Sequence, residues 1–97
     1  MKLKYSEHLQ RRLGLRKIEY DLPRKIFEQS DERYFDEETG HSVATMKAEV
    51  YNKTREVMVA YVVEGETAKL LTIHPLKKGQ KENRVNTGRW RKIHGRV

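Results

Sequence analysis

The sequence of 97 residues contains no cysteine. Disulfide bonds and thiolate metal sites are therefore excluded, and a reducing cytoplasm is the expected compartment. The histidines show no H-x-x-x-H or H-x-H spacing, so we expect no metal and no other cofactor; they are His8, His41, His74 and His94. No apolar run approaches the roughly 18 residues of a membrane span, and the N-terminus lacks a signal-peptide apolar region. The sequence thus predicts a cytoplasmic protein that makes no membrane contact.

Familiar catalytic motifs are lacking as well. There is no phosphate-binding loop, nucleophile elbow or zinc motif. Asp36, Glu37 and Glu38 follow one another directly. A glycosidase needs two defined carboxylates across a cleft, so this run is better interpreted as a solvated loop. These absences leave charge as the main indication of function.

Positive charge is concentrated at the two ends of the chain. The net charge is +7, and residues 75–97 hold eight Lys and Arg against one Glu. Residues 1–25 carry a net +5, residues 26–40 a net −5, and residues 41–74 are neutral. Such clustering is typical of a protein that binds a polyanion, usually nucleic acid. The alternative is a charged surface that serves solubility alone.

The length predicts a single domain covering residues 1–97. Three apolar runs between His41 and Pro75 are separated by Asn52-Lys53-Thr54 and Glu64-Gly65-Glu66, the pattern of an antiparallel meander. The run of residues 57–63 is apolar on both sides, which predicts the central strand. A further short strand is expected at residues 32–36, joined to the meander by a loop that ends at Gly40.

Two helices are expected before the sheet. Ser6 is a suitable N-cap for the first, and Gly14 is the residue expected at its C-terminal end. Asp21 is the predicted N-cap of the second, which should run to about Ser30 with Pro23 in its first turn. We therefore predict an α+β fold with two N-terminal helices (residues 1–30) on one face of a four-stranded antiparallel sheet (31–75). Residues 76–97 are predicted to form a basic tail, either irregular or partly disordered.

The order of short motifs resembles a known family. The motifs are His8-x-x-x-Arg12 closed by Gly14-Leu15, then Tyr34-Phe35-Asp36-x-x-Thr39-Gly40, then Thr72-Ile73-His74-Pro75. This arrangement resembles small uncharacterised microbial proteins that look like the RelE/ParE superfamily of toxins, especially the BrnT-like ribonuclease toxins. The resemblance implies a small basic α+β protein of a toxin-antitoxin system. It further implies RNA cleavage without a metal and neutralisation by an antitoxin partner.

Three residues are the candidate catalytic groups for such a reaction. Cleavage of RNA needs a base for the 2′-hydroxyl proton, an acid for the leaving oxygen and cations for the phosphorane. His8 and Arg12 lie one helical turn apart and would project side by side. His74 stands at the end of a strand, where side chains often border a cleft. The alternatives are a solvated surface pair for His8 and Arg12, and a histidine bonded to backbone for His74.

Eight further residues are candidates for nucleic-acid binding. Cationic side chains contact phosphates, and an aromatic ring between arginines can stack on a base. These candidates are Lys47, Lys77, Lys78, Lys81, Arg84, Arg89, Trp90 and Arg91. Trp90 has an equally weighted alternative, in which the indole fills the edge of the core. Lys47 could likewise cover apolar neighbours with its stem.

Together these features predict an RNA-directed, toxin-like protein that acts as a metal-independent endoribonuclease. RNA is its predicted partner, with an acidic antitoxin protein as a second. Two other classes stay open: a nucleic-acid-binding module without catalysis, and a protein-interaction subunit.

Overall fold

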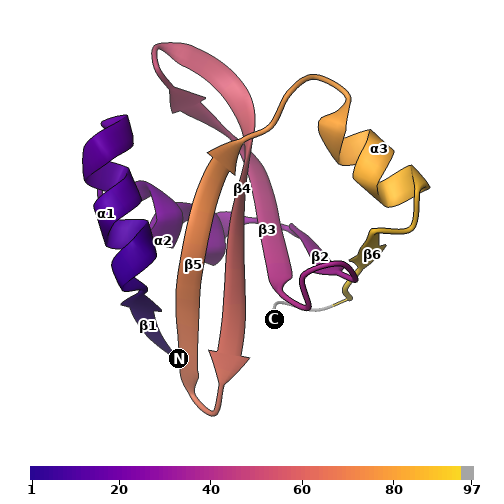
Figure 1. Cartoon of the computed structure of the whole chain (residues 1–97), viewed down its shortest axis with the longest axis horizontal. Coiled ribbons are helices and arrows are strands. Elements are labelled where there is room, and N and C mark those ends of the chain that lie inside the picture. Colours follow the sequence, from indigo (N-terminus) through magenta and orange to yellow (C-terminus); the bar gives the residue numbers. More distant parts are fainter. Residues whose placement is uncertain (95–97) are drawn as a thin grey trace.

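The computed structural model describes residues 1–94 and shows a mixed sheet combined with helices on both of its faces. The elements in chain order are β1 (Lys2–Tyr5), α1 (Glu7–Arg16), α2 (Leu22–Gln29), β2 (Glu32–Asp36), β3 (Ser42–Val50), β4 (Lys53–Glu64), β5 (Thr67–Pro75), α3 (Gln80–Asn86) and β6 (Trp90–Lys92). Figure 1 shows α1 and α3 flanking the long strands β4 and β5. None of the helices within residues 1–94 has an apolar stretch of the length that a membrane span requires.

The prediction of a four-stranded antiparallel sheet is wrong, although the α+β class is confirmed. The sheet has six strands in the order β1-β5-β4-β3-β2-β6. β1 pairs with β5 in parallel, while β6 pairs with β2 antiparallel at the other edge. The two unpredicted strands have four and three residues and are rich in Lys and Arg. Strands this short and charged carry no apolar alternation that a sequence pattern could reveal.

The meander from β3 to β5 is confirmed. β4 pairs with both β3 and β5, as expected for the central strand. The first turn is one residue earlier than predicted, because Tyr51 and Asn52 both adopt positive φ angles of 54° and 62°. Two such residues form the tight turn that matches the twist of adjoining strands. β5 ends at Pro75, where the ladder loses its backbone donor.

Both predicted helices pack on the same sheet face. Leu9 and Leu13 of α1 and Ile26 and Phe27 of α2 share one buried cluster with Val57, Val59 and Tyr61 of β4. The intervening β4 residues Met58 and Ala60 point to the opposite face. We call this opposite side the open face, because α1 and α2 leave it uncovered.

The first helix is longer than predicted. Gly14 lies inside α1, and the residue in the left-handed conformation is Lys17, with φ of 54°. The backbone N–H of Lys17 donates to Gly14 and that of Ile18 donates to Leu13 at 3.1 Å. These are the two hydrogen bonds of a Schellman motif. Ile18 and Leu13 are both buried in the cluster that α1 and α2 form with β4, and such apolar residues commonly accompany this motif.

The predicted irregular tail is ordered over residues 76–94, and residues 95–97 lie outside the described part. Leu76 and Trp90 are buried beside Tyr34 and Met58 on the open face. Lys81 of α3 pairs with Glu56 at 2.9 Å and with Glu32 at 3.1 Å. These partners lie far back in the chain, so the local sequence of the tail did not reveal that it folds.

Candidate functional site: a histidine and arginine cluster

One stripe of α1 carries three residues that can bear positive charge. His8, Arg12 and Arg16 follow at intervals of four, so they lie along one side of the helix. The neighbouring stripe of Leu9 and Leu13 is buried against the sheet. This packing holds the charged stripe next to β5. β1 covers β5 only over residues 67–70, so the rest of that strand edge is open to side chains from α1.

His74 projects from β5 on the open face. Its backbone pairs with Met58 of β4, whose side chain belongs to the open-face core. Nη1 of Arg16 reaches around the edge of β5 and lies 3.1 Å from Nδ1 of His74. The other ring nitrogen, Nε2, lies 3.2 Å from Oγ1 of Thr72. The ring is therefore held by both of its nitrogens.

The surroundings of His74 favour a neutral imidazole. Partial burial lowers the pKa of His74 below its ordinary value, and the charges of Arg16, Arg12, Arg84 and His8 lower it further. A neutral imidazole at physiological pH is able to accept a proton. We refer to these five residues as the His74 cluster.

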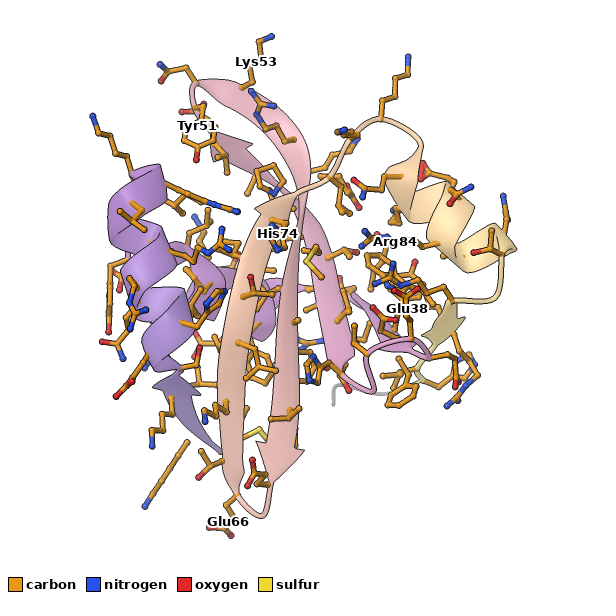
Figure 2. All side chains as sticks on the ribbon, in the orientation of Figure 1. Glu38, Tyr51, Lys53, Glu66, His74 and Arg84 are labelled. Atoms are coloured by element: carbon orange, nitrogen blue, oxygen red, sulfur yellow. The ribbon has the colours of Figure 1, made fainter. Side chains whose placement is uncertain are left out.

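Arg84 joins the cluster from α3. Figure 2 shows His74 between α1 and α3, with Arg84 and Glu38 on the α3 side. The Arg84 guanidinium lies 5.1 Å from the centre of the Trp90 ring, a cation–π contact that orients it. Within residues 1–94, neither Arg12, Arg16 nor Arg84 forms an ion pair with a carboxylate. The cluster thus presents cations that an anionic ligand can still reach.

A cavity of about 260 Å³ opens beside His74. It is lined by His74, Pro75, Leu76, Lys77, Gln80 and Arg84. A second cavity of about 490 Å³ shares Leu76 and Lys77 with it and contains Lys47, Arg55 and Lys78. Because they share these residues, the two cavities are adjacent. We call them the His74 cavity and the lysine cavity.

Of the three predicted catalytic residues, only His74 lines the His74 cavity. His8 and Arg12 act electrostatically on His74 from α1. Sequence reasoning did not assign a role to Arg16, although its contact with His74 is the closest in the cluster. The indication was present in the spacing of His8, Arg12 and Arg16. It was missed because the helix was expected to end at Gly14, which would have taken Arg16 out of the stripe.

The predicted nucleic-acid-binding residues divide into two groups. Lys47, Lys77 and Lys78 are exposed and line the lysine cavity, and Arg84 lines the His74 cavity. Lys81, Arg89 and Arg91 form ion pairs with Glu56, Asp36 and Glu37, respectively, and the pair of Arg91 with Glu37 is exposed to solvent. Partial burial alone would lower the pKa of Lys81, but hydrogen bonds to Glu56 and Glu32 raise it.

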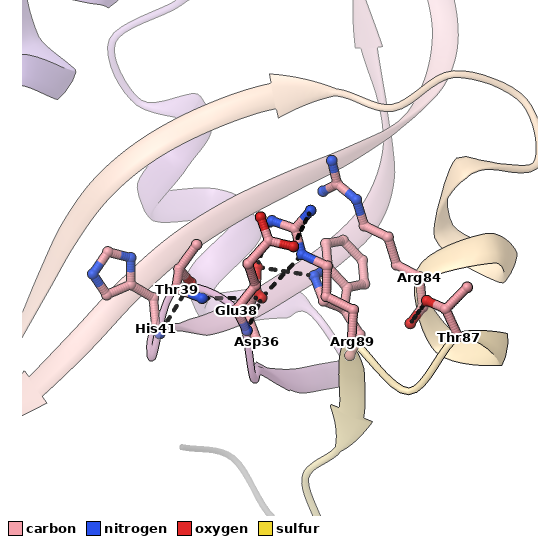
Figure 3. A network of polar contacts seen from close by, with 8 residues as sticks. Asp36, Glu38, Thr39, His41, Arg84, Thr87 and Arg89 are labelled. Carbon is pink, nitrogen blue, oxygen red and sulfur yellow. Dashed lines mark hydrogen bonds and ion pairs between the residues drawn. The ribbon is translucent and has the colours of Figure 1, made fainter.

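Trp90 follows the alternative in which it fills the core. Only 1% of the residue is exposed, and its ring stacks on Tyr34 with the ring centres 5.5 Å apart. Nε1 of the indole donates to Asp36 at 3.2 Å, and Arg89 donates two further hydrogen bonds to the same carboxylate. Figure 3 shows this network, with Glu38 converging on Arg89 and Arg84 alongside. In this fold the indole has no free face for a base.

Over residues 1–94, no three His, Asp or Glu side chains come together as metal ligands. Comparisons with protein families, with curated proteins and with solved structures find no match to this chain. The function of this chain must therefore be inferred from the chemistry of the His74 cluster.

Proposed function

We propose that this protein is an RNA-directed, toxin-like endoribonuclease that cleaves without a metal ion. The observation that carries the proposal is the 3.1 Å contact between His74 and Arg16, at a place where burial and the charges of Arg16, Arg12 and Arg84 lower the pKa of His74. A proton acceptor surrounded by guanidinium groups matches the two main needs of phosphodiester cleavage.

In the proposed reaction, His74 removes the proton from a ribose 2′-hydroxyl. The 2′-oxygen attacks the adjacent phosphorus, forming the new O–P bond as the bond to the 5′-oxygen breaks. Guanidinium groups stabilise the charge that develops on the phosphorane oxygens. We assign the proton for the leaving 5′-oxygen to His8, on the same stripe as Arg12. The products are a 2′,3′-cyclic phosphate and a free 5′-hydroxyl.

The remaining free cations would bind the flanking RNA. The lysine cavity adjoins the His74 cavity and offers Lys47, Lys77 and Lys78 to neighbouring phosphates. The same cations would attract an acidic antitoxin, which by covering them would block access to RNA. The antitoxin partner is implied by the family resemblance and belongs to the same proposal.

A second candidate is an RNA-binding module without catalysis. It is favoured by the engagement of both His74 nitrogens, one by Arg16 and one by Thr72. A histidine bonded on both sides can serve a purely structural role. In that case, the open face would bind RNA but leave it intact.

Product analysis separates the two candidates. A labelled RNA oligonucleotide is incubated with the protein in excess EDTA, next to the same oligonucleotide with 2′-deoxyribose throughout. The endoribonuclease proposal predicts fragments ending in 2′,3′-cyclic phosphate from RNA and none from the deoxy strand. Binding of both strands without cleavage would establish the non-catalytic module. Fragments with 5′-phosphate ends, or equal cleavage of both strands, would contradict the assigned chemistry.

A further inference from the structure

The contact between Arg16 and His74 defines the tautomer of the histidine. A guanidinium group carries only N–H donors, so Nδ1 of His74 must accept the hydrogen bond from Nη1 of Arg16. The ring proton is then on Nε2, which donates to Oγ1 of Thr72 at 3.2 Å. In this arrangement, the lone pair of Nδ1 is occupied and cannot take a proton from a substrate.

The backbone of Arg16 is anchored by a hydrogen bond and by the end of the helix, whereas its guanidinium makes contacts that another partner can replace. Its backbone carbonyl accepts a hydrogen bond of 2.8 Å from the Tyr51 hydroxyl at the β3–β4 turn. Lys17, in the left-handed conformation, ends the helix directly after it. Beyond His74, the guanidinium donates to just one other group in residues 1–94, the Ile73 carbonyl at 3.5 Å. The base of the side chain is thus anchored while its head can move between partners.

A phosphodiester would compete successfully for this guanidinium. Arginine can bind phosphate oxygens through two parallel hydrogen bonds in which the donor and the acceptor carry opposite charges, whereas Arg16 donates to His74 through Nη1 alone and to an uncharged acceptor. The single bond to a neutral imidazole is weaker. A phosphate entering the cluster would therefore draw the head of Arg16 away from the ring.

We propose that Arg16 occupies Nδ1 of His74 in the free protein and releases it when a phosphodiester binds. This inference builds on the proposed function and gives Arg16 two successive roles. It first keeps His74 neutral and in one tautomer. It then binds the phosphate that His74 is to act on, and the freed Nδ1 receives the 2′-hydroxyl proton. His74 can therefore be hydrogen-bonded through both ring nitrogens in the free protein and still act as the base once RNA is bound.

Several groups besides Arg16 also affect the proton affinity of the His74 ring. Arg12 and His8 face it from α1 and Arg84 from α3, and each lowers the proton affinity of the ring. Met58, on the neighbouring strand, is apolar. A bound phosphate would offset the charge of these cations together, so its arrival should both free Nδ1 and raise the pKa of His74.

The test follows the ring nitrogens of His74 by ¹⁵N NMR across a pH titration. The probe is thymidylyl-thymidine, a dinucleotide with a phosphodiester and no 2′-hydroxyl, so no cleavage takes place. The free protein should show Nδ1 without a proton. Saturation with the dinucleotide should raise the proton affinity of His74 by roughly tenfold, about one pKa unit. Sodium chloride at matched ionic strength should have a smaller effect.

Variants assign the effect to Arg16. Arg16→Gln should raise the proton affinity of His74 in the free protein and reduce the further rise on adding dinucleotide. Arg16→Lys retains a donor for Nδ1 and should keep the free-protein titration near wild type. Arg11→Gln removes the same charge from an exposed position of α1 and should behave as wild type. A protonated Nδ1 in the free protein, no response to dinucleotide, or an unchanged titration in Arg16→Gln would each overturn the proposal.

This outcome is separate from that of the proposed function. If the predicted titration is found but RNA is never cleaved, the coupling between Arg16 and His74 stands and the endoribonuclease proposal fails. If RNA is cleaved but His74 titrates alike in wild type and Arg16→Gln, the endoribonuclease proposal stands and the coupling between Arg16 and His74 fails.

Discussion

Asp36 accepts hydrogen bonds from side chains and backbone together. Its carboxylate accepts hydrogen bonds from Arg89, from the indole of Trp90, and from the backbone N–H of Glu38 and Thr39. Burial by itself would raise the pKa of Asp36, but these donors, Arg89 first, lower it to about 2. The residue joins the β2–β3 loop to β6 and keeps Trp90 in place beside the open face.

Acid should therefore weaken the fold through Asp36. Because its folded pKa of about 2 is below the ordinary value of 3.8, its contribution is complete above about pH 4 and is lost as the pH falls toward 2. The shift corresponds to a contribution on the order of 2 kcal/mol. Chemical denaturation of wild type and Asp36→Asn should give a difference in unfolding free energy that shrinks over this range.

The control for this experiment is Glu37→Gln, which removes an exposed pair with Arg91 and should cost well under 1 kcal/mol at every pH. A difference between wild type and Asp36→Asn that stays constant from pH 5 to pH 2 would show that Asp36 does not titrate as described.

Sequence reasoning at single positions succeeded where chemistry was local. Ser6 is the predicted N-cap and accepts the Leu9 N–H at 3.0 Å, and His74 lies at the end of its strand, as predicted. It could not determine which cations remain free, because Arg89 and Lys81 find their partners about 50 residues away. The sequence likewise could not decide whether Trp90 stacks on a base or fills the edge of the core, because its partners Tyr34 and Asp36 are also distant in the chain.

At the level of helices and strands, the long periodic segments were predictable and the short ones were not. β3, β4 and β5 have the apolar alternation or continuous burial that defines a strand. β1 and β6 are formed by pairing with strands already in place, so their own sequence gives no signal. The error at the end of α1 had a functional consequence, since it concealed the position of Arg16.

Replacing Gly14 with alanine tests the corrected helix. Gly14 is inside α1, and a Cβ added there meets nothing within 4 Å. We expect Gly14→Ala to stabilise the protein by about 0.5–1 kcal/mol, because alanine loses less backbone entropy in a helix. Thermal and denaturant unfolding would measure the change. Gly40→Ala is the contrasting variant, because Gly40 has φ of +77°, where a side chain is strained, and it should destabilise the protein. A destabilised Gly14→Ala would support the original prediction that the helix ends there.

Across the whole molecule, the fold redistributes the charge that the sequence shows. The acidic stretch of residues 26–40 supplies Glu32, Asp36 and Glu37 to cations of the basic tail. The tail is therefore partly neutralised where it lies on the sheet. Within residues 1–94, cations that form no ion pair with a carboxylate include Arg12 and Arg16 on α1 and Lys47, Lys77, Lys78 and Arg84 around the two cavities. We therefore propose the margins of the open face as the RNA surface.

This distribution predicts which cations control the salt dependence of RNA binding. For single strands, each neutralised phosphate contributes about 0.7 to the slope of log K against log salt. The double variant Lys77→Gln/Lys78→Gln should reduce the slope by about 1.4. Arg91→Gln removes a cation that is paired with Glu37 and should change the slope much less. Fluorescence anisotropy with a 2′-deoxy oligonucleotide measures both. Equal changes in the two variants would mean that internal pairing does not decide which cations bind.

The most direct measurement of the central claim is the single-turnover rate of RNA cleavage in EDTA by three proteins: wild type, His74→Gln and Arg11→Gln. His74→Gln removes the proposed base, and Arg11→Gln removes an exposed charge on α1 outside the stripe of His8, Arg12 and Arg16. We expect at least a 100-fold loss of rate for His74→Gln, in line with general base catalysis. We expect a rate close to wild type for Arg11→Gln. Cleavage by His74→Gln at the wild-type rate would contradict the claim that RNA is cleaved at the His74 cluster.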